Sequence, residues 1–163
     1  MSLVLHRWLK ITLLNLFIVA ALGVVLRYKI AWSLPFIDQK HLLHGHSHFA
    51  FAGWISQAIM VLMVAYLTKE KGVSVFKKYS WLLYANLLTA YSMLIAFPIE
   101  GYGLYSIIFS TLSIIVSYAF AIVYWRDLNR LKNKSVGHKW FKAAVFFNAF
   151  SSLGAFALAI MMV

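Results

Sequence analysis

The chain has 163 residues, of which 63% are hydrophobic and 12% charged, and its mean hydropathy is +0.82. These values lie outside the range of soluble globular domains and place the chain in a lipid bilayer. The absence of cysteine excludes disulfides, thiolate-ligated zinc, iron–sulfur clusters and covalent heme attachment through a Cys-x-x-Cys-His motif. Any metal or cofactor would therefore depend on histidine, carboxylate or methionine ligands.

Five apolar runs approach the roughly 20 residues that a membrane-spanning helix needs. They are continuous, whereas the strands of a membrane β-barrel alternate between polar and apolar residues. We therefore expect an all-α, polytopic transmembrane helical bundle in which residues 1–163 form one unit with five spans. The predicted spans are Leu9 to Leu26, His44 to Leu67, Trp81 to Phe97, Tyr102 to Trp125 and Trp140 to Val163.

The first run follows a basic start, Met1 to Lys10, and resembles a secretory signal in outline. Because the apolar residues continue to Leu26, we interpret this run as an uncleaved span. Asn15 lies in its middle, and Gln57 lies inside the second run. We expect both amides to form hydrogen bonds between helices rather than to act as ligands.

Four of the six histidines, His41, His44, His46 and His48, fall within eight residues at the start of the second run. At 100° per residue, His41, His44 and His48 share one face of a helix and His46 points away from it. Neutral imidazole binds heme iron, copper and zinc, and ionisable groups at membrane depth are functional candidates. Alternatively, these rings lie in the headgroup layer without a ligand. Gly53, in the second run, has no side chain, so we expect a flat group or the backbone of another helix to approach this helix closely there.

Glu100 is the only charged residue of the turn after the third span, on the same side of the membrane as the histidines. Two interpretations are open: a carboxylate that supports a ligand or transfers a proton, or a solvated turn residue. His6 and His138 fall on the opposite side, so we exclude both from the site. The last span ends at Val163 without a polar tail, which indicates part of a longer polypeptide or a chain that a partner completes.

The formal net charge of +11 lies between the apolar runs rather than on one soluble face, which argues against nucleic-acid binding. With five spans, twelve of the fifteen basic residues lie on the side of the N-terminus. The positive-inside rule then places the N-terminus in the cytoplasm and the histidines near the outer, periplasmic face, as in a bacterial inner membrane. The twelve are Arg7, Lys10, Lys69, Lys71, Lys77, Lys78, Arg126, Arg130, Lys132, Lys134, Lys139 and Lys142.

The segment Leu43-His44-Gly-His-Ser-His-Phe-Ala-Phe-Ala-Gly53 resembles the second helix of the catalytic subunit of heme–copper oxidases and nitric oxide reductases. In that family a Leu-His pair opens an aromatic-rich helix, a small residue follows about nine positions later, and the histidine binds the low-spin heme. His46-Ser-His48 with Gly53-Trp54 further resembles the His-x-His and Gly-Trp of small or divergent relatives. The resemblance implies respiratory electron transfer, with His44 as an axial ligand of heme b, His48 or His46 in support, and Gly53 at the small position.

The family's copper ligands, its high-spin heme ligand and its second low-spin ligand lie in later helices that this chain lacks. A missing segment, a second copy of the chain or a partner subunit would supply the second ligand, and whether the chain is an oxidoreductase stays open. One alternative is a non-heme zinc, copper or iron site made from His41, His44 and His48 with Glu100. Another is an assembly or metal-handling subunit without a stable cofactor.

Overall fold

The computed structural model describes residues 3–131 and 136–161, with side chains up to Gly154 apart from Val136. Every regular element of this part of the chain is helical, which confirms the predicted all-α bundle. The elements are α1 (Leu3–Ala31), α2 (Gln39–His48), the π-helix η1 (Phe49–Ser56), α3 (Gln57–Lys71), α4 (Phe76–Glu100), α5 (Leu104–Asn129) and α6 (Val136–Met161). The helices α2, η1 and α3 follow one another without a break and form one long helix over 39–71.

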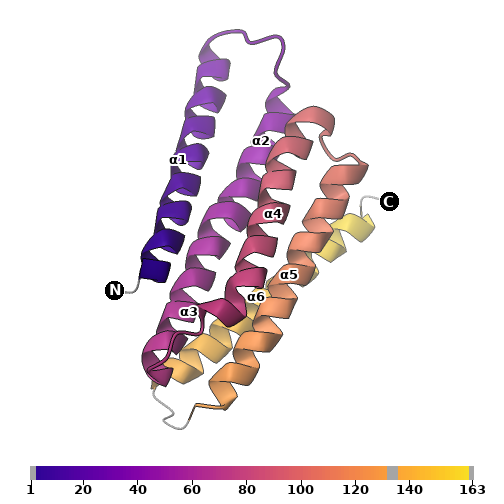
Figure 1. Ribbon diagram of the computed structural model, residues 1–163. Helices are drawn as coiled ribbons and strands as arrows, with labels where there is room; N and C mark the ends of the chain where they lie inside the picture. Colours follow the sequence, from indigo (N-terminus) through magenta and orange to yellow (C-terminus); the bar gives the residue numbers. More distant parts are fainter. Residues whose placement is uncertain (1–2, 132–135, 162–163) are drawn as a thin grey trace.

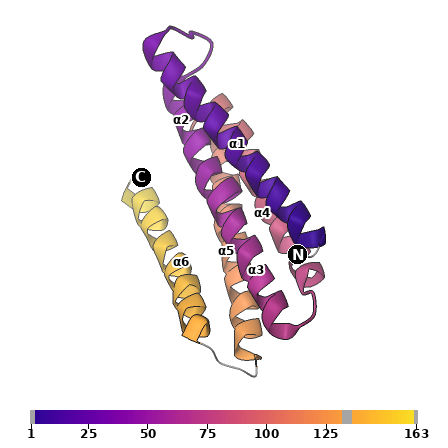
Figure 2. The same cartoon turned by 90° about the vertical axis from the view of Figure 1, so that its left-hand side faces the viewer.

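The long helix 39–71 lies at the centre of the bundle, with α1 on one side and α4 on the other (Figure 1). Next to α4 packs α5, and α6 packs mainly on α5. Figure 2 shows α6 leaning away from the other helices, on the opposite side of the bundle from α1. The start of α1, the α3–α4 turn, the end of α5 and the start of α6 lie toward one end of the bundle (Figure 1). We call this the basic end, and the end that carries the α1–α2 and α4–α5 connections the histidine end.

Four helices of the described part are long and apolar enough to cross a membrane: Leu3–Ala31, Gln39–Lys71, Phe76–Glu100 and Leu104–Asn129. They correspond to the first four predicted spans. The first three helices extend beyond their predicted spans at both ends, and the fourth starts two residues later than predicted and ends four residues later. Polar residues that flank an apolar run can stay helical, because the headgroup layer solvates them. The fifth predicted span corresponds to α6, which is not among the four. Its most apolar side chains, after Gly154, lie outside the described residues.

Helix α4 continues through Pro98 to Glu100, although the sequence predicted an end at Phe97. A proline lacks the backbone N–H that a helix interior requires, but in the last turn it removes only one hydrogen bond. The helix closes with a hydrogen bond of 2.9 Å from the Gly101 amide to the Phe97 carbonyl. Gly101 has φ +62° and ψ −131°, a conformation with positive φ that glycine adopts without strain.

The main hydrophobic core occupies the basic end, where α3, α4 and α5 bring large side chains together. Tyr79, Leu82, Leu83 and Tyr124 are fully buried there. At this end the buried Asp127 of α5 also accepts hydrogen bonds from Lys78 at 2.7 Å and Tyr79 at 2.8 Å. A second, smaller apolar cluster lies closer to the histidine end and contains Val19, Phe49 and Ala90.

Candidate functional site

Asp38 starts the helix that carries the histidines. Its side chain accepts a hydrogen bond of 2.8 Å from the His41 amide, as an N-cap does. This backbone hydrogen bond lowers the pKa of the exposed Asp38 carboxyl below its ordinary value. The cap begins α2 at Gln39, so the four histidines lie in the first three turns of the helix.

Three of the histidines face the connection between α4 and α5. The His48 ring stacks on Phe97, with ring centroids 4.2 Å apart, and the His44 ring meets Tyr102 edge-on at 4.6 Å. The His41 ring lies against Gly101, in the space that a side chain would fill. The predicted common face of His41, His44 and His48 is confirmed.

His46 faces the opposite side of the helix and lies next to α1. Its Cε1 atom is 3.6 Å from the point where a Cβ on Gly23 would stand, so the ring packs closely on the α1 backbone. The predicted separation of His46 from the other three is therefore confirmed. The cluster presents imidazole groups to two different neighbours, α1 on one side and the α4–α5 connection on the other.

Two imidazole nitrogen atoms of this cluster are buried without a hydrogen-bond partner: Nε2 of His44 and Nδ1 of His46. A buried polar atom that lacks a partner costs about 1–3 kcal/mol, so such atoms in native structures generally have an explanation. A bound metal, heme iron or water molecule would satisfy either nitrogen. The two atoms belong to different faces, so one ion would not bind both.

The described residues contain no group of three or more His, Asp or Glu side chains arranged to hold a metal ion. His41, His44 and His48 share a face, but their rings pack on separate neighbours instead of converging. The assignment of His41, His44, His46 and His48 as metal ligands stays a prediction. A site with three of these ligands would require the rings to leave Phe97, Tyr102 and Gly101.

Glu100 caps the start of α5, a role that neither interpretation drawn from the sequence included. Its Oε1 atom accepts hydrogen bonds from the Ser106 amide at 2.6 Å and the Ser106 hydroxyl at 3.1 Å. Gly103, at the N-cap of α5, has no side chain to do this. Capping by the last residue of the preceding helix is not visible in the sequence, because it depends on how the chain folds between the two helices.

Gly53 accommodates the ring of Phe49 from the preceding turn. A Cβ on Gly53 would stand 2.6 Å from Cε2 of Phe49, so the flat group next to this glycine belongs to its own helix. Phe49 is fully buried, and its ring meets Tyr91 of α4 edge-on at 5.0 Å. The cofactor contact predicted for Gly53 stays a prediction, and it would require the Phe49 ring to move.

The residues after His48 form a π-helix, which the sequence did not predict. Its wider turns change the normal hydrogen-bond pattern, and such segments often occur at functional sites. Side-chain amides from both neighbouring helices bind its carbonyl groups: Asn15 of α1 donates to the Gly53 carbonyl, and Asn86 of α4 donates to the Ala52 carbonyl at 2.9 Å. The segment is therefore attached on two sides immediately below the histidines.

Both predicted interhelical hydrogen bonds are confirmed. Asn15 also accepts a hydrogen bond of 2.7 Å from the Tyr91 hydroxyl, and Gln57 accepts one of 2.9 Å from Asn86. Sequence reasoning noted Asn86 only as a polar residue suited to a buried helix. One sequence signal could have indicated the role of Asn86. The segment Phe49–Ser56 contains small residues, which leave its carbonyl groups accessible to side-chain amides of neighbouring helices.

No protein-family model, curated protein or solved structure matches this chain. The resemblance to the heme–copper oxidase family therefore stays a prediction, which depends on the histidine motif of helix 39–71. His6 is exposed near the start of α1 and His138 is buried near the start of α6, away from the residues 41–48 that carry the other four histidines.

Proposed function

We propose that the chain is a heme-binding electron-transfer protein of a membrane, resembling the N-terminal part of a respiratory oxidase catalytic subunit. The observation that carries the proposal is the buried, unpartnered Nε2 atom of His44 near the end of a helix long enough to span the membrane. Imidazole nitrogen is the usual protein ligand of heme b. When bound, such a heme supplies one-electron transfer.

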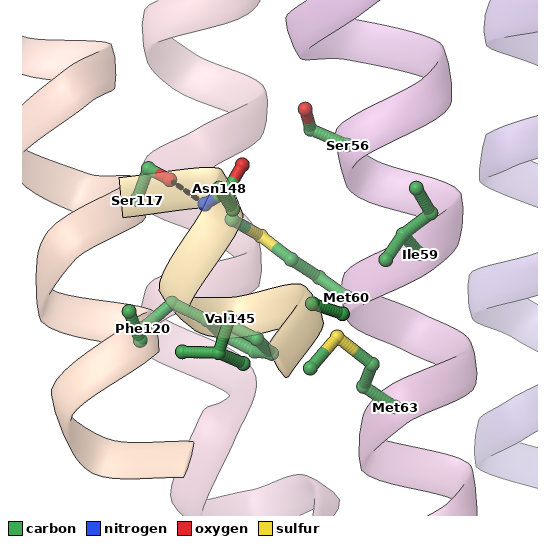
Figure 3. Close-up of a pocket in the computed structure, with 10 residues that line it drawn as sticks. Ser56, Ile59, Met60, Met63, Ser117, Phe120, Val145 and Asn148 are labelled. Atoms are coloured by element: carbon green, nitrogen blue, oxygen red, sulfur yellow. Dashed lines mark hydrogen bonds between the residues drawn. The ribbon is translucent and has the colours of Figure 1, made fainter. Parts of the chain in front are cut away.

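The imidazole nitrogen atoms of the cluster are suitable axial ligands for heme iron. The space next to Gly53 cannot hold a porphyrin, because the Phe49 ring fills it. Neither the cavity between α3, α5 and α6 (Figure 3) nor the one between α4 and α5 has any of the four histidines in its lining. A porphyrin would therefore lie at the surface of this chain and be covered by another segment, a second copy or a partner subunit. The same element would supply the second axial ligand, because no other histidine of this chain lies at the histidine end.

The proposal includes the topology inferred from charge. The basic end would face the cytoplasm and the histidine end the periplasm, with α6 as a fifth span in a bacterial inner membrane. The grouping of the basic connections at one end of the bundle supports this orientation. Cysteine substitution at Phe36 in the α1–α2 connection, followed by a membrane-impermeant thiol reagent on intact cells, tests it. Labelling is expected at Phe36 but not at Val73 of the α3–α4 turn.

The non-heme metal site has less support. The histidine rings do not converge within the described part of the chain, and Glu100 is engaged in capping α5. A metal-handling or assembly role also stays open as a prediction. These alternatives differ from heme binding in the residues that they require.

The test is an optical spectrum of the purified protein after heme supplementation, in the oxidised and reduced states. We expect a Soret band that disappears in His44→Ala and persists in His41→Ala. The control is His6→Ala, which removes an exposed histidine on α1 and should leave the spectrum unchanged.

Absence of a Soret band in the wild-type protein, or its persistence in His44→Ala, would refute heme ligation by His44. Metal analysis of the same samples separates the alternatives. A stoichiometric metal that is lost in any one of His41→Ala, His44→Ala or His48→Ala would indicate the non-heme site instead.

A further inference from the structure

Tyr102 covers the unpartnered nitrogen atom of His44 on the outer side of the bundle. Two aromatic rings lie against His44: Phe97, with ring centroids 6.2 Å apart, and Tyr102, with ring centroids 4.6 Å apart. Phe97 is fully buried, whereas Tyr102 is 52% exposed. The Tyr102 ring therefore lies between His44 and the surroundings, and Nε2 of His44 is buried while the ring stays there.

The two ends of the α4–α5 connection are held in place. At the end of α4, Pro98 packs on the helix that carries the histidines: its Cδ atom is 3.0 Å from the point where a Cβ on Gly45 would stand. Across the connection, the Glu100 carboxylate accepts hydrogen bonds from the amide and the hydroxyl of Ser106. Residues 100 and 106 are therefore fixed relative to each other, and only the short connection between them is left to move.

Tyr102 stands between two glycines in this connection. Gly101 has φ +62°, and Gly103 is the last residue before α5. Glycine has no Cβ, so both residues can absorb large changes of φ and ψ at little cost, as hinge residues do. Rotation at these two positions swings the Tyr102 ring away from His44 without moving either helix.

We propose that Tyr102 is a hinged lid over His44, which closes the heme site in the free protein and swings aside when iron binds Nε2. This inference rests on the heme-binding function proposed above and adds a step that controls access to the site. The lid and the iron compete for the same space beside the imidazole ring. Heme binding therefore requires the open form, and the apparent affinity is reduced by the fraction of molecules that are closed.

The closed and open positions of Tyr102 are close in free energy. A contact between two aromatic rings favours the closed position by up to about tenfold in the equilibrium constant. The unpartnered Nε2 atom of His44 favours the open position by a similar factor, about tenfold, because water or a ligand satisfies this atom once the ring moves. Neither contribution dominates, so a ligand that binds Nε2 shifts the balance to the open position.

The first measurement is a titration of the full-length protein with hemin in phosphatidylcholine nanodiscs, followed by the Soret band. Because a lid lowers the apparent affinity, Tyr102→Ala is expected to bind hemin about tenfold more tightly than the wild-type protein. A ring that only packs against the heme would give the opposite result, since its loss weakens binding. Tyr102→Phe keeps the ring and should match the wild type. The control Tyr105→Ala, which removes an exposed tyrosine at the start of α5, should also match it.

The second measurement needs no heme. Diethylpyrocarbonate acylates accessible imidazole nitrogen atoms, and fragmentation mass spectrometry gives a rate for each histidine. In the wild-type protein without heme, we expect His44 to react more slowly than the exposed His6. In Tyr102→Ala the rate at His44 should rise about tenfold. The rate at His46, which faces α1, should stay unchanged.

The two measurements separate the lid from the heme-binding function. Faster acylation of His44 in Tyr102→Ala, without a Soret band in any variant, would refute heme binding and support the lid. If Tyr102→Ala loses helical content, Tyr102→Leu, which lacks the aromatic contact but keeps some bulk, replaces it. A Soret band whose apparent affinity falls or stays equal in Tyr102→Ala would overturn the lid. So would a His44 that reacts as fast in the wild-type protein as in Tyr102→Ala.

Discussion

The amide of Asn86 connects α4 to the π-helix below the histidines, and its replacement by leucine tests whether that connection stabilises the fold. Asn86 is 1% exposed and donates hydrogen bonds of 2.9 Å to both the Ala52 carbonyl and the Gln57 side chain. Leucine has a similar shape but no donor, so both acceptors lose their partner. Hydrogen bonds between transmembrane helices average about 0.6 kcal/mol and reach about 1.7 kcal/mol. Two of them predict a loss of about 1–2 kcal/mol in the free energy of unfolding.

The assay is reversible unfolding in mixed micelles of a mild detergent and SDS. The control is Asn148→Leu, the same exchange at an exposed amide that donates one interhelical hydrogen bond, to Ser117, where Asn86 donates two. Hydrogen exchange of the backbone amides over 49–57 should also increase in Asn86→Leu, because the carbonyl groups of the π-helix lose an interhelical contact. The reasoning is refuted if Asn86→Leu destabilises no more than Asn148→Leu and leaves exchange over 49–57 unchanged.

Three further predictions concern the carboxylates. Glu100→Ala should destabilise the protein by about 1 kcal/mol in thermal unfolding, because α5 loses its cap on Ser106; a change in heme titration at unchanged stability would contradict capping. Below its lowered pKa Asp38 becomes protonated and the cap on the His41 amide weakens, so this contribution is present above the unfolded-state pKa and is lost as the pH falls. Asp38→Asn should remove that pH dependence of exchange at the His41 amide, and its persistence would refute the assignment. Asp127→Ala should lower the free energy of unfolding in SDS by about 1–3 kcal/mol. This loss is smaller than for breaking a fully buried ion pair, because Lys71 and Lys78 are 24% and 47% exposed and water can solvate them once Asp127 is gone. A variant as stable as the wild-type protein would contradict this.

Much of the bundle could be predicted from the sequence because membrane insertion depends on local properties. A run of about 20 apolar residues satisfies its own backbone hydrogen bonds as a helix whatever surrounds it. The first four spans were located this way, and so was the common face of His41, His44 and His48, which follows from helical periodicity alone. The ends of the spans were predicted less accurately, because single side chains and turns decide where a helix starts or stops. Asp38 caps the start of α2, and α4 continues past Pro98 to Glu100.

The sequence by itself therefore determined an all-helical membrane bundle with a two-faced histidine cluster at one end of a long helix. Only the tertiary structure decided what each face meets: Phe97 and Tyr102 on one side, and the α1 backbone on the other. It also decided the π-helix at Phe49–Ser56, whose carbonyl groups accept hydrogen bonds from donors on the neighbouring helices. Asn15 and Asn86 supply the matching amides from positions 38 and 34 residues away in the chain, a distance over which no local pattern is informative.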